Sequence, residues 1–203
     1  MAALLLSLTG AAIKLSGYAR YVVGILRGEM RPNMATWTLW IFLSSLNSAS
    51  YLVMSGDPLK SAVAIAGTTG CLITYAVAMR KGVMQPLNSW DRAALGSGFV
   101  AAAAWIAFRS ASSANLILQA GFLISMIPTY RGLLADRNAE KPAPWLLMAG
   151  AYAVNGAVVA LRWDGHPAQF AYPLINIVSH AGVGIFAAMR NVPQLAVQPA
   201  EER

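Results

Sequence analysis

The stretch that decides the fold is WTLWIFLSSLNSASYLVMSGD, residues 37–57, because a similar stretch, WLLMAGAYAVNGAVVALRWD, recurs at residues 145–164. Each holds a Trp, an Asn ten residues later and an Asp at its end: Trp37, Asn47 and Asp57 in the first, Trp145, Asn155 and Asp164 in the second. Each repeat unit then closes on a Met-Arg pair, at residues 79–80 and 189–190. Many transporters are built from a duplicated apolar unit, with a site between the two halves.

The composition predicts an integral membrane protein. Of the 203 residues, 57% are hydrophobic and only 11% are charged, whereas soluble domains carry about 25% charged residues. The net charge of +7 fits the basic cytoplasmic loops of membrane proteins, and without a basic run we expect no nucleic-acid partner. Cys71 is the only cysteine, so neither an intrachain disulfide nor a metal site is expected.

Seven segments have, or approach, the roughly 20 residues that a helix needs to cross a bilayer. They are residues 2–26, 31–57, 61–79, 93–108, 110–130, 142–161 and 167–189. The repeat assigns three segments to each unit and leaves the fourth as a linker. We therefore predict an all-α polytopic fold of seven transmembrane helices in a 3+1+3 arrangement of parallel repeats. The expected parts are a first repeat (1–81), a linker with the fourth helix (82–109), a second repeat (110–190) and a tail (191–203).

The distribution of basic residues predicts the orientation. One side of the membrane would carry Arg27, Arg31, Arg80, Lys81, Arg92, Arg131, Arg137, Lys141, Arg190 and Arg203. The other side would carry only Lys60, Arg109 and Arg162. Because basic loops stay in the cytoplasm, we expect a cytoplasmic C-terminus and an external N-terminus in a bacterial inner (plasma) membrane.

The segment SMIPTYR, residues 125–131, is followed by a polar loop that reaches Glu140 and then by Pro142. With the 3+1+3 topology, this segment resembles the SWEET and PQ-loop transporter superfamily, in which a Pro-Gln pair precedes a charged loop. Thr129 stands in the place of the Gln, and Gly24 is the first-unit equivalent of Pro128. The chain also resembles an uncharacterised group of small bacterial membrane proteins, through PNMATW at residues 32–37 and IPT at residues 127–129.

The superfamily resemblance implies alternating access around a central site lined by an Asn on each unit's third helix and a Trp on the second. Asn176 matches one of these positions, whereas the third helix offers only Thr68 and Thr69 nearby. Trp37 and Trp145 lie near the expected cytoplasmic ends of their helices. With Trp40, they are typical of interfacial anchors, and a gating role for Trp37 and Trp145 remains an alternative.

Polar residues inside the spans are the candidate substrate-binding groups, because such residues are costly in a membrane. Asn47 and Asn155 occupy equivalent positions, where they either face each other across a cavity or join helices by hydrogen bonds. Asn176 and His180 are four residues apart and therefore share one helix face. They either bind the solute, with His180 responding to pH, or form a satisfied buried cluster.

Lys14 lies near the middle of its span without an acidic residue at its depth. This position fits a contact to an anionic solute, a helix that starts at a different depth, or a lysine held in its neutral form. Gln119 and Tyr75 are weaker binding candidates. Pro128 and Gly24 are candidate hinge or gating positions, since proline frees a backbone carbonyl.

These features predict a SWEET-like facilitator that moves a sugar or another small polar metabolite between two three-helix units. The alternative is a binding protein on the same fold, as KDEL receptors are, that recognises its ligand without transport. We expect no enzyme, because no catalytic constellation is recognisable in the spans. We expect no cofactor, the lipid bilayer and a small-molecule solute as partners, and leave a homo-oligomer open.

Overall fold

The computed structural model describes residues 1–30, 34–81, 87–136 and 139–190. In this part of the chain all regular structure is helical, as predicted. The elements are α1 (Ala2–Leu26), α2 (Met34–Ser55), α3 (Pro58–Lys81), α4 (Ser89–Phe108), α5 (Ala111–Ala135), α6 (Pro142–Leu161), the short 3-10 helix η1 (Pro167–Phe170) and α7 (Ala171–Arg190). The start of the PNMATW segment, the predicted tail (191–203) and the basic residues Arg31, Arg137 and Arg203 lie outside the described residues.

Local sequence explains several helix ends. The Asn88 side chain accepts hydrogen bonds from the backbone N–H groups of Trp90 and Asp91, and the Asp91 carboxylate accepts one from Asn88. This capping box starts α4 at Ser89, four residues before the predicted start of the span. Pro142 opens α6, where a proline loses no helical hydrogen bond. After α1, Gly28 has a φ of 72°, a conformation that glycine adopts at little cost.

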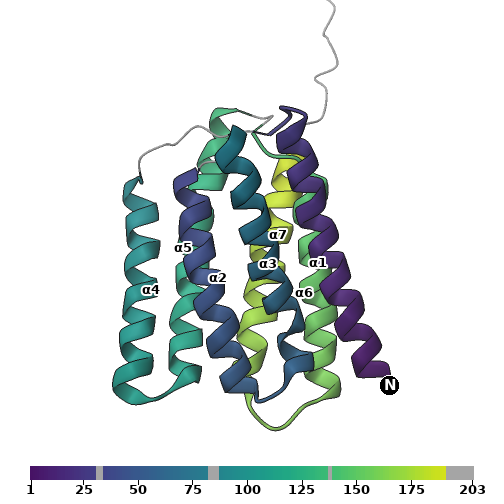
Figure 1. Cartoon of the computed structure of the whole chain (residues 1–203), viewed down its shortest axis with the longest axis vertical. Coiled ribbons are helices and arrows are strands. Elements are labelled where there is room, and N and C mark those ends of the chain that lie inside the picture. Colours follow the sequence, from purple (N-terminus) through teal and green to yellow (C-terminus); the bar gives the residue numbers. More distant parts are fainter. Residues whose placement is uncertain (31–33, 82–86, 137–138, 191–203) are drawn as a thin grey trace, which may run out of the picture.

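Five helices are long and apolar enough to cross a membrane: α1, α3, α5, α6 and, with η1, α7. The sequence predicted seven spans, and the two that do not meet this criterion are α2 and α4. With 22 and 20 residues, these helices still reach about 30 Å. Both run alongside the other five (Figure 1). The chain thus has the helices of a multi-pass membrane protein.

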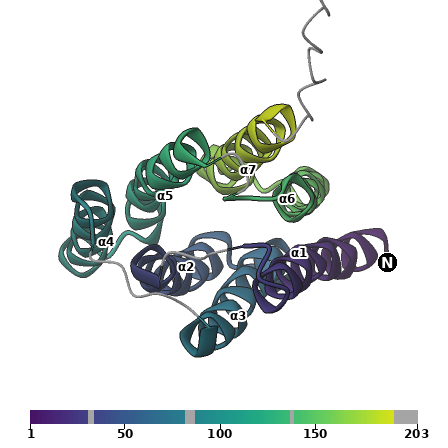
Figure 2. The same cartoon turned by 90° about the horizontal axis from the view of Figure 1, so that it is seen from above.

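The helices form two facing rows when the bundle is viewed along its axis (Figure 2). In one row α3 packs against both α1 and α2, and in the other α7 packs against both α5 and α6. The rows meet where α1 packs on α6 and α2 packs on α5. Helix α4 lies at one edge, against α5 and α2.

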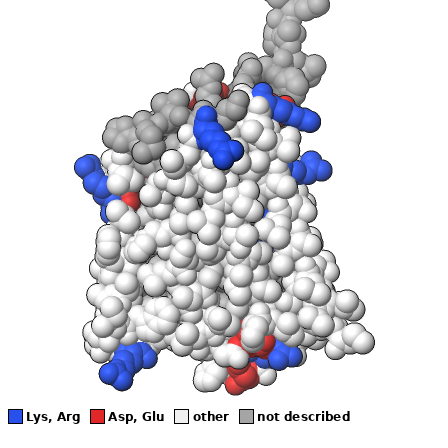
Figure 3. All heavy atoms as spheres, viewed as in Figure 1, with Lys and Arg blue, Asp and Glu red and all other residues white. Residues whose placement is uncertain are grey.

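Charged residues gather at the two ends of the bundle, and a broad uncharged band separates them (Figure 3). We call the ends upper and lower, as drawn in Figure 1; α1, α3, α5 and α7 terminate at the upper end. Large apolar side chains are exposed along the band, including Phe99, Ile106 and Val178. Water would disfavour so much apolar surface, so contact with a lipid bilayer follows.

Candidate functional site

A small cavity lies between the two rows of helices. Its volume is about 30 Å³, room for two or three water molecules at roughly 10–15 Å³ each. Side chains from α1, α2, α3, α5, α6 and α7 line it. The lining includes Tyr18, Trp40, Asn47, Tyr152, Asn176 and His180.

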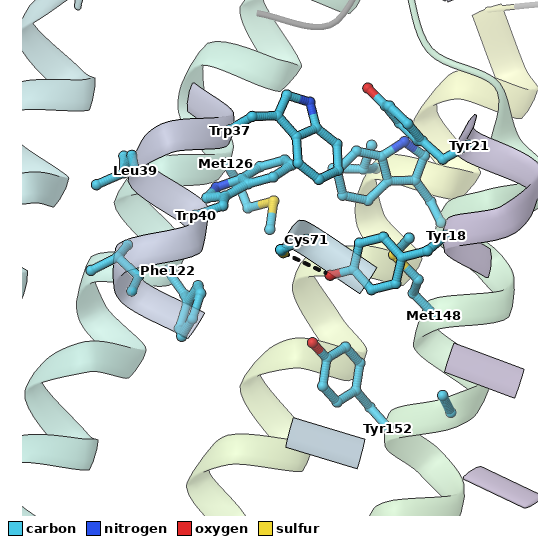
Figure 4. Packing of buried hydrophobic residues seen from close by; sticks show 14 of the residues in the cluster. Tyr18, Tyr21, Trp37, Leu39, Trp40, Cys71, Phe122, Met126, Met148 and Tyr152 are labelled. Carbon is cyan, nitrogen blue, oxygen red and sulfur yellow. Dashed lines mark hydrogen bonds between the residues drawn. The ribbon is translucent and has the colours of Figure 1, made fainter. Parts of the chain in front are cut away.

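Tyr21, Trp37 and Trp40 line the upper part of the cavity (Figure 4), and Trp145, which also lines it, packs against Trp40 to complete an aromatic cluster. Trp37 lies 5.1 Å, centroid to centroid, from both Tyr21 and Trp40, and Trp40 lies 5.8 Å from Trp145. The prediction that the three Trp residues are interfacial anchors is wrong, because their exposed fractions are only 3%, 8% and 2%. Internal acceptors satisfy two of the buried indoles: the N–H of Trp40 donates to Ser125 and that of Trp145 to Glu140.

Glu140 closes the upper end above this cluster. Its Oε1 accepts a hydrogen bond of 3.0 Å from the Tyr21 hydroxyl, and its Oε2 accepts one of 3.0 Å from Trp145 Nε1. The carboxyl therefore joins α1 to the start of α6. Desolvation raises the pKa of Glu140 from its ordinary 4.5 to about 7, although both hydrogen bonds oppose the shift. The sequence placed Glu140 only in a polar loop, since nothing local reveals its contact with Tyr21, which is 119 residues away.

A network of side-chain amides crosses the bundle beside the cavity. Asn47 Oδ1 on α2 accepts hydrogen bonds of 3.0 Å from both Asn115 and Gln119 on α5. Asn176 Nδ2 on α7 donates to Gln119 Oε1 at 3.1 Å. Gln119 thus connects the two candidates Asn47 and Asn176. Asn115 was not predicted, although its position four residues before Gln119 places it on the same helix face.

Asn155 does not lie opposite Asn47. Its Nδ2 donates at 2.7 Å to the backbone oxygen of Lys60 on α3, and its buried Oδ1 has no hydrogen-bond partner among the described residues. The repeat equivalence gave the two residues similar depths but did not determine their neighbours. Asn47 contacts α5, whereas Asn155 contacts the start of α3.

Lys14 is fully buried against the cavity wall. Its Nζ donates a 2.7 Å hydrogen bond to the Tyr152 hydroxyl on α6, lies 3.9 Å from the centroid of the Tyr152 ring and 5.3 Å from that of Tyr18. The His180 ring stacks beside Tyr152 with its centroid at 4.9 Å, and its Nδ1 lies 3.0 Å from the Asn176 carbonyl oxygen. The structure therefore brings Lys14, Tyr152 and His180 together.

Two ion pairs join the rows at the lower end. Lys60 Nζ lies 2.6 Å from Asp164 Oδ2, and Arg162 pairs with Asp57. Lys60 also donates to the side chain of Gln169 at 2.7 Å. The hydrogen bond from Lys60 holds the pKa of Asp164 well below its usual range. Asp57 and Asp164, which mark the ends of the repeated stretches, thus each bind a cation from the opposite row.

The remaining candidates lie away from the cavity. Tyr75 is half-buried and packs against the hydrophobic core. Pro128 lies inside α5, which continues to Ala135. Gly24 lies in the last turn of α1, and its carbonyl accepts hydrogen bonds from the backbone of Glu29 and Met30.

Within the described ranges, no group of three or more His, Cys, Asp or Glu residues could hold a metal ion. No known family model matches this chain, and no curated protein or solved structure shows a significant match to it.

Proposed function

We propose that this protein is a seven-helix facilitator that moves a small polar solute across a bacterial inner membrane by alternating access. One observation carries the proposal: the polar and aromatic cavity lies between the two rows of helices, and polar contacts join the rows at both ends of the bundle.

The packing order supports two equivalent units. In α1–α3 the third helix lies between the first two, and in α5–α7 the last helix likewise lies between the other two. If the units are equivalent, α1 corresponds to α5 and α2 to α6. The contact of α1 with α6 then has its counterpart in the contact of α5 with α2. With α4 as linker, this is the order expected of parallel repeats and agrees with the resemblance to SWEET and PQ-loop proteins.

The two closures supply the parts of an alternating-access cycle. Separating the rows at the upper end breaks the hydrogen bond between Tyr21 and Glu140. Separating them at the lower end breaks the pairs Lys60–Asp164 and Arg162–Asp57. Opening at one end while the other stays closed exposes the cavity to one side of the membrane, so the solute crosses without a continuous pore. We assign this structure, in which both sets of contacts are formed, to the step of the cycle between the two open states.

Within this cycle Asn47, Asn176 and His180 contact the solute, since all three line the cavity. Asn155 stays out of contact and supports the lower closure through Lys60. The positive-inside rule places the upper end in the cytoplasm, because most basic residues belong to its connections.

A reversible cross-link tests the proposal. Asp57→Cys and Arg162→Cys are combined with Cys71→Ser, which removes the only native cysteine, and the protein is reconstituted into liposomes. Flux of radiolabelled sugars, amino acids, nucleosides and organic anions is measured before and after a short thiosulfonate cross-linker, and again after reduction. We expect a transported solute whose flux stops on cross-linking and returns on reduction, while each single-cysteine protein is unaffected.

Flux that survives an efficient cross-link contradicts alternating access. Solute binding without flux, in uncross-linked protein, favours the alternative of a KDEL-receptor-like binding protein. A binding protein would use the same cavity and require no opening of the lower closure.

A further inference from the structure

The ammonium group of Lys14 lies over the rings of Tyr18 and Tyr152, two residues that line the cavity, and the packing does not explain its charge. The side chain is 0% exposed, and its single hydrogen bond goes to the neutral Tyr152 hydroxyl. Ion pairs in the described part of the chain join Lys60 to Asp164 and Arg162 to Asp57, and neither includes Lys14. The two cations at the lower end therefore have carboxylates, whereas the deeper cation has none.

A buried charge without an opposite charge destabilises a fold strongly. A methionine of similar length would fill the same space without that penalty, so packing alone gives no reason for a lysine here. Intramembrane ionisable residues typically mark the path of a substrate or ion. We expect the anionic partner, which the described residues do not supply, to come from the solute.

We propose that Lys14 and Tyr152 form an anion subsite, and that the solute is a small monocarboxylate. This inference rests on the proposed function and names its substrate class. One carboxylate oxygen accepts from Lys14, whose ammonium has two protons left after its bond to Tyr152. The hydroxyl of Tyr152, which accepts from Lys14, keeps its own proton to donate to the second oxygen.

The surroundings fit a small organic anion. In Figure 4 the hydroxyl groups of Tyr18 and Tyr152 point into the same region, and Tyr18 is hydrogen bonded to Cys71. Aromatic rings there offer apolar surface for a short carbon chain. A dicarboxylate would leave its second charge unpaired, since no lysine or arginine is among the described residues that line the cavity, and Lys60, the other fully buried lysine, is paired with Asp164. The cavity volume of about 30 Å³ favours a solute of a few atoms.

The test compares a carboxylate with its amide, which has the same shape and no charge. Radiolabelled L-lactate and lactamide are offered to proteoliposomes at pH 7.5, and protein-free liposomes give the background. The proteins are wild type, Lys14→Met, Tyr152→Phe and Arg20→Met. Arg20 is an exposed cation on the same helix, so Arg20→Met is the matched control for loss of charge. Binding of both probes is measured separately by tryptophan fluorescence, because three Trp residues line the cavity.

We expect wild type to move lactate at least about tenfold faster than lactamide, because lactamide lacks the charge-assisted hydrogen bond to Lys14 and such a bond changes affinity by about that factor. Lys14→Met should abolish this preference, Tyr152→Phe should reduce it, and Arg20→Met should keep it. If lactamide moves as fast as lactate, or Lys14→Met keeps the preference, the anion subsite is refuted and the facilitator stands. If lactate binds in a Lys14-dependent manner without flux, the subsite stands and the facilitator is refuted. If Lys14→Met does not fold, Tyr152→Phe decides between these outcomes.

Discussion

The upper closure should make the stability of the protein depend on pH through Glu140. Burial raises the pKa of this carboxyl from 4.5 to about 7, so the folded state holds its proton more tightly than the unfolded state. The stability that the protonated Glu140 contributes to the folded state is therefore complete below pH 4.5, and it is lost as the pH rises through 7. At about 1.4 kcal/mol for each pKa unit, ionisation at high pH destabilises the fold by about 3 kcal/mol.

Glu140→Gln removes the ionisation but keeps only one acceptor oxygen for Tyr21 and Trp145. One of these groups loses its hydrogen bond, which costs about 1 kcal/mol. We therefore expect the variant to be more stable than wild type by about 2 kcal/mol at pH 8 and nearly equal to it at pH 5. For a chain of this size the difference at pH 8 corresponds to about 4–8 °C in the unfolding midpoint.

Thermal unfolding of both proteins in one detergent between pH 5 and pH 8.5 measures this difference. Glu29→Gln is the control, because Glu29 is an exposed carboxylate just after α1, the helix whose Tyr21 donates to Glu140. A difference between Glu140→Gln and wild type that does not change with pH would refute the reasoning. If wild type instead gains stability relative to Glu140→Gln as the pH rises, the pH dependence has the opposite sign to the one expected, and the reasoning is also refuted.

Three further predictions follow from the cavity wall, the lower closure and the subsite. An alanine Cβ at Gly70 would lie 2.0 Å from Tyr18 Cδ2, so Gly70→Ala should destabilise by about 1–3 kcal/mol in thermal unfolding. Gly150→Ala, which meets no atom within 4 Å, should not; equal effects would contradict the packing. Arg162→Met removes the ion pair with Asp57, so the lower end should open more often. A membrane-impermeant maleimide should then label the buried Cys71 up to about fivefold faster, the factor expected from the loss of one partly exposed ion pair. An unchanged rate would exclude opening through the lower end. If lactate crosses as an anion without a coupled ion, an inside-positive potential of about 100 mV should accumulate it inside the liposomes by up to about 50-fold. Accumulation that does not depend on the potential would contradict this uncoupled movement.

Composition and hydrophobic runs were enough to predict the helices, because a bilayer permits few other structures. The start of α4 was missed, since the capping box at Asn88 extends the helix beyond the apolar run. The Trp residues were misassigned because an indole near a membrane boundary suits either a lipid interface or a packed cluster. The acceptors Ser125, 85 residues from Trp40, and Glu140, in the connection before α6, distinguish the two, and both become visible only in the fold. Lys14 was recognisable as unusual from its depth alone, but its proximity to Tyr152 required the fold.

The buried ammonium of Lys14 should also exclude small cations from the interior of the bundle. A second positive charge about 4 Å away would be repelled by about 4 kcal/mol at an effective dielectric constant near 20. That repulsion reduces the residence of a sodium, potassium or hydronium ion there by roughly a thousandfold. An energised inner membrane depends on its ion gradients, and any protein that opens a path through it risks dissipating them. In the proposed facilitator, a fixed cation beside the cavity would let an organic anion pass while small cations are kept out.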